Sequence, residues 1–246
     1  MKLRYSKLSF YALCALLIVG KPLSAIGSTN AQSSNAAITH VNVATVESVE
    51  EVTQENPFEM IQNVASNTFE RMKSEQSNIQ SNPEVLRDIM EQELMPYIDY
   101  RFSAYKVLGK YARSLKRKEL HEFVSVFRQY LITSYAVAMG YYDDQTVEFE
   151  PAVDYGKRTD VTVRAVIVDD VRPDIKVAFK VRKDKKTNRW SAYDMVAEGI
   201  SLLSSKQSEF EAVIRKDGIQ EVISLMRKTI DKPITLQGQA QNEAAE

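Results

Sequence analysis

The chain has 246 residues, of which 44% are hydrophobic and 26% are charged, an ordinary composition for a globular protein. Its 32 basic and 33 acidic residues give a net charge of −1, which does not favour a nucleic-acid partner. The eight glycines form neither G-x-G-x-x-G nor a P-loop pattern, so no nucleotide cradle is predicted.

The first 27 residues have the pattern of a secretion signal. Three basic residues precede an uncharged apolar run over 8–19, which is shorter than the roughly 20 residues that a membrane span needs. The small residues Ala25 and Gly27 then mark the region where cleavage is expected. We therefore expect residues 1–27 to be a signal peptide. Its removal would take away four basic and no acidic residues, for a net charge of about −5.

The only cysteine, Cys14, lies inside that apolar run and follows Leu13 rather than a small residue, so no lipid anchor is predicted. The exported chain would then have neither disulfides nor thiolate metal ligands. We expect a soluble periplasmic protein with three parts: a flexible linker over 28–55, a folded domain over 56–230 and a flexible C-terminal tail over 231–246.

Four helices are predicted in the first half of the folded domain. Asn56 and Pro57 start one that ends near Ser74, and Asn82 and Pro83 start a second that continues to Pro96. A short helix over 100–108 follows Asp99 and ends at Gly109, and the longest helix runs from about 116 to Gly140.

The hydrophobic period then changes from helical to alternating. Strands are predicted over 147–149, 161–167, 175–181 and 189–196, with a polar hairpin turn over 183–188. Helices return at Ser204 or Ser205 and, after Gly218, from Ile219 to Met226. The predicted class is α+β, with a four-stranded antiparallel sheet bracketed by N-terminal and C-terminal helices.

The residues that could carry catalysis are few. His40 lies in the expected linker, and the neighbours of His121 at helical spacing are basic, apolar or hydroxyl side chains, so neither a triad nor a metal site is predicted. Two aspartate pairs, 143–144 and 169–170, fall at strand ends, where turn chemistry explains them. Asp194 shares alternation with Trp190 and Ala192, but the simplest interpretation is a carboxylate that accepts backbone hydrogen bonds. We predict no catalytic residue, metal or cofactor.

A basic strip surrounds the last predicted hairpin. Lys180, Arg182 and Arg189 belong to it, together with three further lysines. A charge run of this kind is usually a solvated face. The alternative is contact with lipid headgroups, an acidic protein or a membrane surface.

Two stretches resemble the MlaC family of periplasmic phospholipid carriers, also known from toluene tolerance. The first is Met95–Tyr100, followed by Val107–Tyr111 and the aromatic helix after it; the second is the W-x-x-Y-D and E-G-x-S run over 190–201, followed by Phe210. The resemblance covers residues 57–229. This chain departs from the family at Lys206 and Gln207, where a Tyr-Arg pair is usual, so no contact at that position is carried over.

The resemblance implies a curved sheet with helices on its concave side, enclosing an apolar pocket for acyl chains. The implied function is a monomeric, non-enzymatic carrier that shuttles phospholipid between an outer-membrane lipoprotein complex and an inner-membrane ABC-type transporter complex, maintaining outer-membrane lipid asymmetry. From parity, the predicted pocket residues are Val107, Leu108, Phe123, Phe127, Tyr135, Val147, Phe149, Val163, Val177, Phe179, Trp190, Tyr193 and Ile200. Lys180, Arg182 and Arg189 are the candidate headgroup or partner contacts.

Two alternatives stay open from the sequence. One is a small periplasmic enzyme that uses Asp194 or Glu198 as a base of raised pKa in a hydrophobic pocket. The other is an export adaptor or lipoprotein chaperone that binds protein-linked acyl chains.

Overall fold

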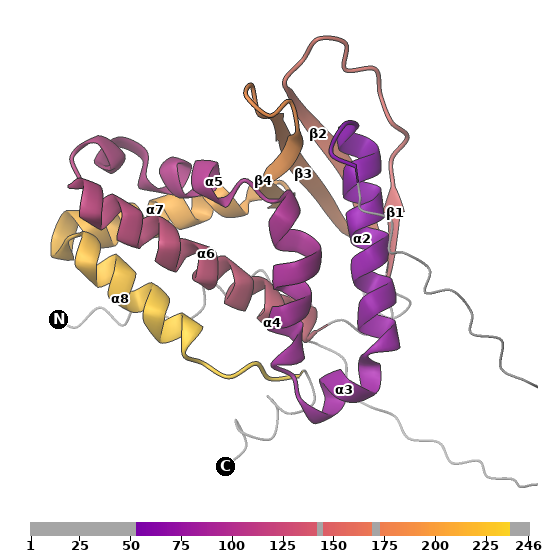
Figure 1. The fold of residues 1–246 in the computed structure, drawn as a ribbon, viewed down its shortest axis with the longest axis horizontal. Coiled ribbons are helices and arrows are strands. Elements are labelled where there is room, and N and C mark those ends of the chain that lie inside the picture. Colours follow the sequence, from indigo (N-terminus) through magenta and orange to yellow (C-terminus); the bar gives the residue numbers. More distant parts are fainter. Residues whose placement is uncertain (1–52, 142–144, 169–172, 237–246) are drawn as a thin grey trace, which may run out of the picture. The chain divides into compact units, whose positions relative to one another are not determined.

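The residues that the structure describes form helices and one antiparallel sheet (Figure 1). The computed structural model describes residues 53–141, 145–168 and 173–236. The predicted signal peptide, most of the predicted linker and the last ten residues of the predicted tail lie outside these ranges. Among the helices so described, none combines the length and apolarity that crossing a bilayer requires. The predicted α+β class and antiparallel pairing are confirmed.

The first helix, α2 (Pro57–Ser74), starts as its sequence predicts. The side chain of Asn56 accepts a hydrogen bond from the backbone N–H of Phe58 (3.0 Å), and Pro57 occupies the first turn, where a missing N–H costs nothing. The short helix α3 (Gln76–Ser81) was not predicted, because its six residues include one apolar side chain, Ile79, and so show no period.

The prediction of one continuous helix up to Pro96 is wrong in its second half. An α-helix, α4, covers Val85–Ile89; a π-helical turn, η2 (Met90–Leu94), and a 3-10 turn, η3 (Met95–Tyr97), follow it. Pro96 has no N–H to continue the helical ladder and its ring crowds the preceding turn, so the chain leaves the α conformation before reaching it.

Four further helices lie side by side away from most of the strands (Figure 1). They are α5 (Tyr100–Leu108), which leads into the 3-10 turn η4 (Gly109–Arg113), α6 (Arg117–Met139), α7 (Leu202–Asp217) and α8 (Ile219–Ile230). Asp99 caps α5 through a bond from the N–H of Phe102 (3.0 Å), and Gly109 follows it with a φ of 52°, as its glycine predicts. The apolar faces of these four helices form one buried cluster.

The sheet has five strands rather than the four expected. In order they are β1 (Thr146–Phe149), β2 (Asp160–Val168), β3 (Ile175–Lys183), β4 (Trp190–Ala197) and β5 (Ile200–Ser201). Each neighbouring pair is antiparallel. β5 escaped prediction because two residues are too few to alternate. Ile98 also forms an isolated parallel bridge with Ala192 of β4, in which the N–H of Asp99 donates to the carbonyl of Ala192 (2.8 Å).

A register shift divides β4 into two halves. Val181 lies opposite Ala192, whereas Lys180 lies opposite Asp194, so Tyr193 is the extra residue of a β-bulge. Each half keeps its alternation, but the extra residue reverses the parity between them. The prediction that Asp194 shares a face with Trp190 is therefore wrong: the two side chains point to opposite faces of the sheet.

Asp194 joins the sheet to the start of α7. Its Oδ1 accepts a hydrogen bond from the N–H of Leu203 (3.0 Å), and its Oδ2 accepts the hydroxyl of Ser201 (2.7 Å) and pairs with the ammonium of Lys180 (3.0 Å). Ser201 in turn caps the helix, so α7 begins at Leu202 and not at the expected Ser204 or Ser205. The side chain of Asp194 is 2% exposed, and its acceptors are satisfied.

The ordered chain continues past the expected start of the C-terminal tail at residue 231. Ile234 and Leu236 are buried in a cluster with residues of α2, α3, α4 and α6. The N–H of Ile234 donates to the side chain of Glu84 (2.8 Å). Because the segment after residue 231 is mostly polar, its sequence did not predict the burial of Ile234 and Leu236.

We predict that Asp194→Ala lowers the free energy of unfolding by about 3 kcal/mol, because a buried N–H and hydroxyl lose their acceptor and Lys180 loses its partner. Asp194→Asn keeps one acceptor and should cost about 1–2 kcal/mol. Denaturant unfolding measures both. The exposed Asp217→Ala is the control and should stay within about 0.5 kcal/mol of the parent. If Asp194→Ala were as stable as this control, the structural role of Asp194 would be refuted.

Candidate functional site: the apolar face of the sheet

One face of the sheet is apolar along β2, β3 and β4, and α2 covers one end of it. The residues buried there form what we call the sheet-face cluster: Phe58, Met60, Ile61, Val64, Val161, Val163, Val181 and Trp190. The strand members come from the alternate positions that the pleat directs to one side. The aromatic ring of Tyr155 closes over this end and meets Trp190 edge-on, with 5.5 Å between ring centroids.

The large side chains beyond this covered end are not fully buried. Phe179 lies in the central strand, β3, between Val163 of β2 and Met195 of β4. Val163 is completely buried, yet Phe179 and Met195 keep part of their surface accessible, as does Phe149 on β1. A solid core would cover a phenylalanine in the middle of a sheet face. The side chains in the described ranges therefore leave this part of the face only partly covered.

A second set of half-buried apolar side chains surrounds the turn after α4. Met90, Met95 and Ile132 form a small buried group, which we call the methionine cluster. The side chains packed against it are only partly buried: Leu94, Ile98, Tyr100, Tyr135 and Met139. Leu94 also packs against the sheet-face cluster, so the two groups are in contact through this residue.

Tyr135 of α6 is a partly buried residue of the methionine cluster. Burial raises the pKa of Tyr135 to about 12, and the charge of Asp194 contributes in the same direction. The residue as a whole is nevertheless only half-buried. Part of the residue's surface therefore stays accessible, although burial dominates the environment of its phenol.

Six of the predicted pocket residues share the apolar sheet face. They are Val147 and Phe149 of β1, Val163 of β2, Val177 and Phe179 of β3, and Trp190 of β4. The indole N–H of Trp190 is buried without a hydrogen-bond partner among the described residues. Tyr135 lies on the neighbouring methionine cluster.

Four other predicted pocket residues lie elsewhere, in the helical cluster. Val107 and Leu108 of α5 and Phe123 and Phe127 of α6 are almost fully buried against α7 and α8. The rings of Phe123 and Phe127 stack with centroids 5.8 Å apart, and Phe210 meets Phe123 edge-on at 6.4 Å. This packing is that of a filled core.

Tyr193 and Ile200 lie apart from both clusters. Tyr193 is the bulge residue on the polar side of the sheet, where its hydroxyl contacts the carboxylate of Asp160 (3.1 Å) and its ring meets Phe102 edge-on. Burial and the Asp160 charge raise the pKa of Tyr193 to about 12. Ile200 is half exposed in the edge strand β5. Neither side chain joins the sheet-face cluster.

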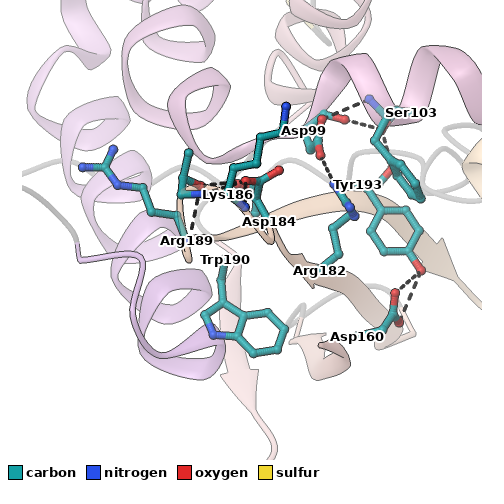
Figure 2. A network of polar contacts seen from close by, with 12 residues as sticks. Asp99, Ser103, Asp160, Arg182, Asp184, Lys186, Arg189, Trp190 and Tyr193 are labelled. Atoms are coloured by element: carbon teal, nitrogen blue, oxygen red, sulfur yellow. Dashed lines mark hydrogen bonds and ion pairs between the residues drawn. The ribbon is translucent and has the colours of Figure 1, made fainter. Parts of the chain in front are cut away.

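Polar contacts connect the start of α5 to the strands (Figure 2). The guanidinium of Arg182 pairs with Asp99 at 2.6 Å and lies 4.2 Å from the ring centroid of Phe102. Ser103 donates to the carbonyl of Tyr193 (2.7 Å). These contacts attach the first turns of α5 to β3 and β4.

Two of the three candidate headgroup cations form ion pairs within the protein. Lys180 pairs with Asp194 and Arg182 with Asp99, so both charges are already offset by carboxylates. Arg189 is exposed at the end of the β3–β4 hairpin. In that hairpin, Asp184 accepts the backbone N–H groups of Lys186 and Thr187, and these bonds lower its pKa.

The two carboxylates of the enzyme hypothesis are both engaged by hydrogen-bond donors. Asp194 is held by Ser201, Leu203 and Lys180 on the polar side of the sheet, and Glu198 is exposed in a turn, where it accepts the N–H of Lys176 (2.6 Å). The aspartate pairs 143–144 and 169–170 lie outside the described residues. Within the described ranges no cluster of side chains has the composition of a metal site.

Sequence reasoning did not assign several residues that complete this region. Phe58, Ile61 and Val64 recur at a helical period in α2, but such a period does not say which sheet face the helix will cover. Leu94 ends the apolar stripe predicted before Pro96, but the stripe does not say which cluster its last residue will join. Tyr97 follows Pro96 and belongs to no helical period. Tyr155 lies in a loop, and the sequence carries no signal for its contact with Trp190.

Comparison with known proteins gives a consistent result. The family model described as MlaC protein matches residues 62–228. The intermembrane phospholipid transport system binding protein MlaC of Haemophilus influenzae is 29% identical over 185 residues, covering 74% of this chain and 86% of that protein. A toluene tolerance protein of Pseudomonas putida is 20% identical over 182 residues, covering 73% of this chain and 80% of that protein.

A solved structure shares the fold. It is the phospholipid-binding protein from Ralstonia solanacearum in complex with a phospholipid, and it matches with a TM-score of 0.63 at 19% identity, covering 71% of this chain and 97% of that one. Because the family model spans most of the folded chain and the resemblance noted at the W-x-x-Y-D and E-G-x-S run falls within it, this chain belongs to the MlaC family.

Proposed function

We propose that the protein is a periplasmic phospholipid carrier that shuttles lipid between an outer-membrane lipoprotein complex and an inner-membrane ABC-type transporter complex. The observation that carries this proposal is the incomplete burial of large apolar side chains at interior positions, above all Phe179 on the central strand. Membership of the MlaC family and the phospholipid-binding relatives support the same function.

The physical requirement on such a carrier is severe. Two acyl chains of roughly 16 carbons lose about 0.8 kcal/mol per methylene exposed to water, on the order of 20–25 kcal/mol in total. A carrier must therefore replace nearly all of this burial with its own apolar surface. It must also release the lipid, so its affinity has to match that of a bilayer rather than exceed it greatly.

We propose that the acyl chains lie between the apolar sheet face and the methionine cluster. The half-buried surfaces of Phe149, Phe179 and Met195 would contact hydrocarbon from the sheet side. Leu94 and Tyr135 would do so from the side of η2 and α6. Such a site uses shape and burial rather than directional bonds, which suits a ligand made mostly of methylene groups.

We predict that protein purified from the periplasm carries a diacyl phospholipid. Solvent extraction followed by mass spectrometry should recover the lipid in near-stoichiometric amount. A protein that is consistently empty and takes up no lipid from vesicles would contradict the carrier proposal. Native mass spectrometry that shows lipoprotein cargo instead would favour the chaperone alternative.

A pair of phenylalanine variants separates the proposed site from the helical core. Phe179→Gln puts an amide on the half-open face and should weaken lipid affinity tenfold or more, while lowering the free energy of unfolding by only about 1–2 kcal/mol. Phe123→Ala empties a filled core and should cost about 3–5 kcal/mol yet retain lipid affinity well below its unfolding temperature. Lipid-transfer titration and denaturant unfolding measure the two effects. The reverse pattern would place the ligand among the helices.

The phenol of Tyr135 should make stability fall at alkaline pH. An unfolded tyrosine ionises near pH 10, whereas burial holds the pKa of Tyr135 at about 12. The contribution is therefore complete below about pH 10 and is lost as the pH rises towards 12. Tyr135→Phe should flatten this decline, leaving the part that comes from Tyr193, in denaturant unfolding at fixed pH values. The exposed Tyr105→Phe is the control, and equal slopes for Tyr135→Phe and the parent would contradict the prediction.

A further inference from the structure

Two arginines gather around one tyrosine where α5 meets α6. The guanidinium carbon of Arg101 lies 6.0 Å from the ring centroid of Tyr100, and that of Arg128 lies 5.8 Å from the same centroid. The Nε of Arg101 is also 3.4 Å from the hydroxyl of Tyr100. We call these three residues the Tyr100 group. Together they offer two guanidinium groups and a phenol, the donors that suit a phosphate oxygen.

The carboxylates near this group leave it with positive charge. Arg128 pairs with Glu91 at 2.8 Å, and the Glu91 side chain is 48% exposed. Asp99 is taken up by its ion pair with Arg182. Arg101 is exposed and forms no ion pair with any residue in the described ranges. The guanidinium of Arg101 thus has no carboxylate partner among the described residues. The guanidinium of Arg128 pairs with Glu91, whose carboxylate is in contact with water.

The Tyr100 group is joined directly to the proposed lipid site. Tyr100 packs against the methionine cluster, as Tyr135 does. On α6 the positions Arg128, Ile132, Tyr135 and Met139 follow one another at helical spacings of four, three and four residues, so they lie along one face. This face is cationic at Arg128 and apolar over the next 11 residues, roughly 16 Å at 1.5 Å per residue.

We propose that the Tyr100 group binds the phosphodiester of the phospholipid whose acyl chains occupy the site between the sheet face and the methionine cluster. The inference rests on the proposed function and adds the position of the headgroup and the orientation of the lipid. The phosphate lies at Arg101, Arg128 and Tyr100, and the chains extend past Ile132 towards Tyr135 and Met139. The ion pairs at Lys180 and Arg182 favour this position over the β3–β4 hairpin.

The test compares two lipids that differ only in the phosphate. Full-length protein is stripped of lipid and titrated with phosphatidylglycerol and with diacylglycerol of the same chains. The double variant Arg101→Gln, Arg128→Gln should bind phosphatidylglycerol about tenfold more weakly or worse, while its affinity for diacylglycerol stays at the parental value. The matched control Lys118→Gln, Lys228→Gln removes two exposed charges from α6 and α8 and should change neither affinity.

A third variant separates ligand binding from a structural role of the Arg128–Glu91 pair. Glu91→Gln frees Arg128 and should bind phosphatidylglycerol at least as tightly as the parent. A loss in Glu91→Gln equal to that in Arg128→Gln would show that the pair acts only by holding η2 to α6, and would overturn the assignment. An unchanged affinity in the double arginine variant would overturn it too.

Two further arms identify the source of the phosphate and protect against a failure of the proposed function. Inorganic phosphate that saturates the Tyr100 group without any lipid effect in the arginine variants would assign the group to a free anion and refute the headgroup position. If the parent bound neither phosphatidylglycerol nor diacylglycerol, the carrier proposal itself would fail. If the parent bound both lipids and the double variant lost the same affinity for phosphatidylglycerol as for diacylglycerol, only the phosphate site would be overturned.

Discussion

The extra residue in β4 is the constraint on which the arrangement of this fold depends. Because Tyr193 is unpaired, Trp190 and Ala192 point to the apolar face, while Asp194 points to the other side of the sheet. There the carboxylate pairs with Lys180 across the strands and accepts the N–H of Leu203 in the first turn of α7. A regular strand would have placed Asp194 among apolar side chains, where an unpaired charge is costly. The bulge therefore allows one short strand to seal a hydrophobic face and also to start a helix.

The two sides of the sheet are stabilised by different interactions. On the polar side, ion pairs and hydrogen bonds from Asp99, Ser103, Arg182 and Asp194 attach α5 and α7 to β3 and β4 at defined positions. On the apolar side, α2 packs over only one end, and the large side chains beyond it keep accessible surface. Hydrogen bonds and ion pairs thus fix the positions of the helices on the polar side. The region proposed for lipid does not depend on such directional contacts. A ligand could enter and leave that region without breaking the contacts that define the fold.

The distribution of charge follows the same division. Several cations that look available in the sequence are committed to carboxylates in the structure, as Lys180 and Arg182 show. Arg101 lies beside Tyr100 without such a partner in the described part of the chain, next to a helix face that becomes apolar within one turn. An amphiphilic ligand has the same sequence of charge and hydrocarbon. An arginine without a carboxylate partner can therefore set the orientation of the ligand, at little cost to folding.

The sequence by itself determined the longer helices and strands, the α+β class and the family, because period, caps and the motif around Trp190 are local properties of the chain. It correctly placed Val147, Phe149, Val163, Val177, Phe179 and Trp190 on one face, since a strand alternates with a period of two. Only the tertiary structure decided that Phe123 and Phe127 belong to a different cluster, that Tyr193 and Asp194 lie across the sheet from Trp190, and that Lys180 and Arg182 are paired. The physical reason is that a single inserted residue reverses parity, and that apolar and charged side chains choose their partners among residues far away in the chain. No local pattern records those contacts.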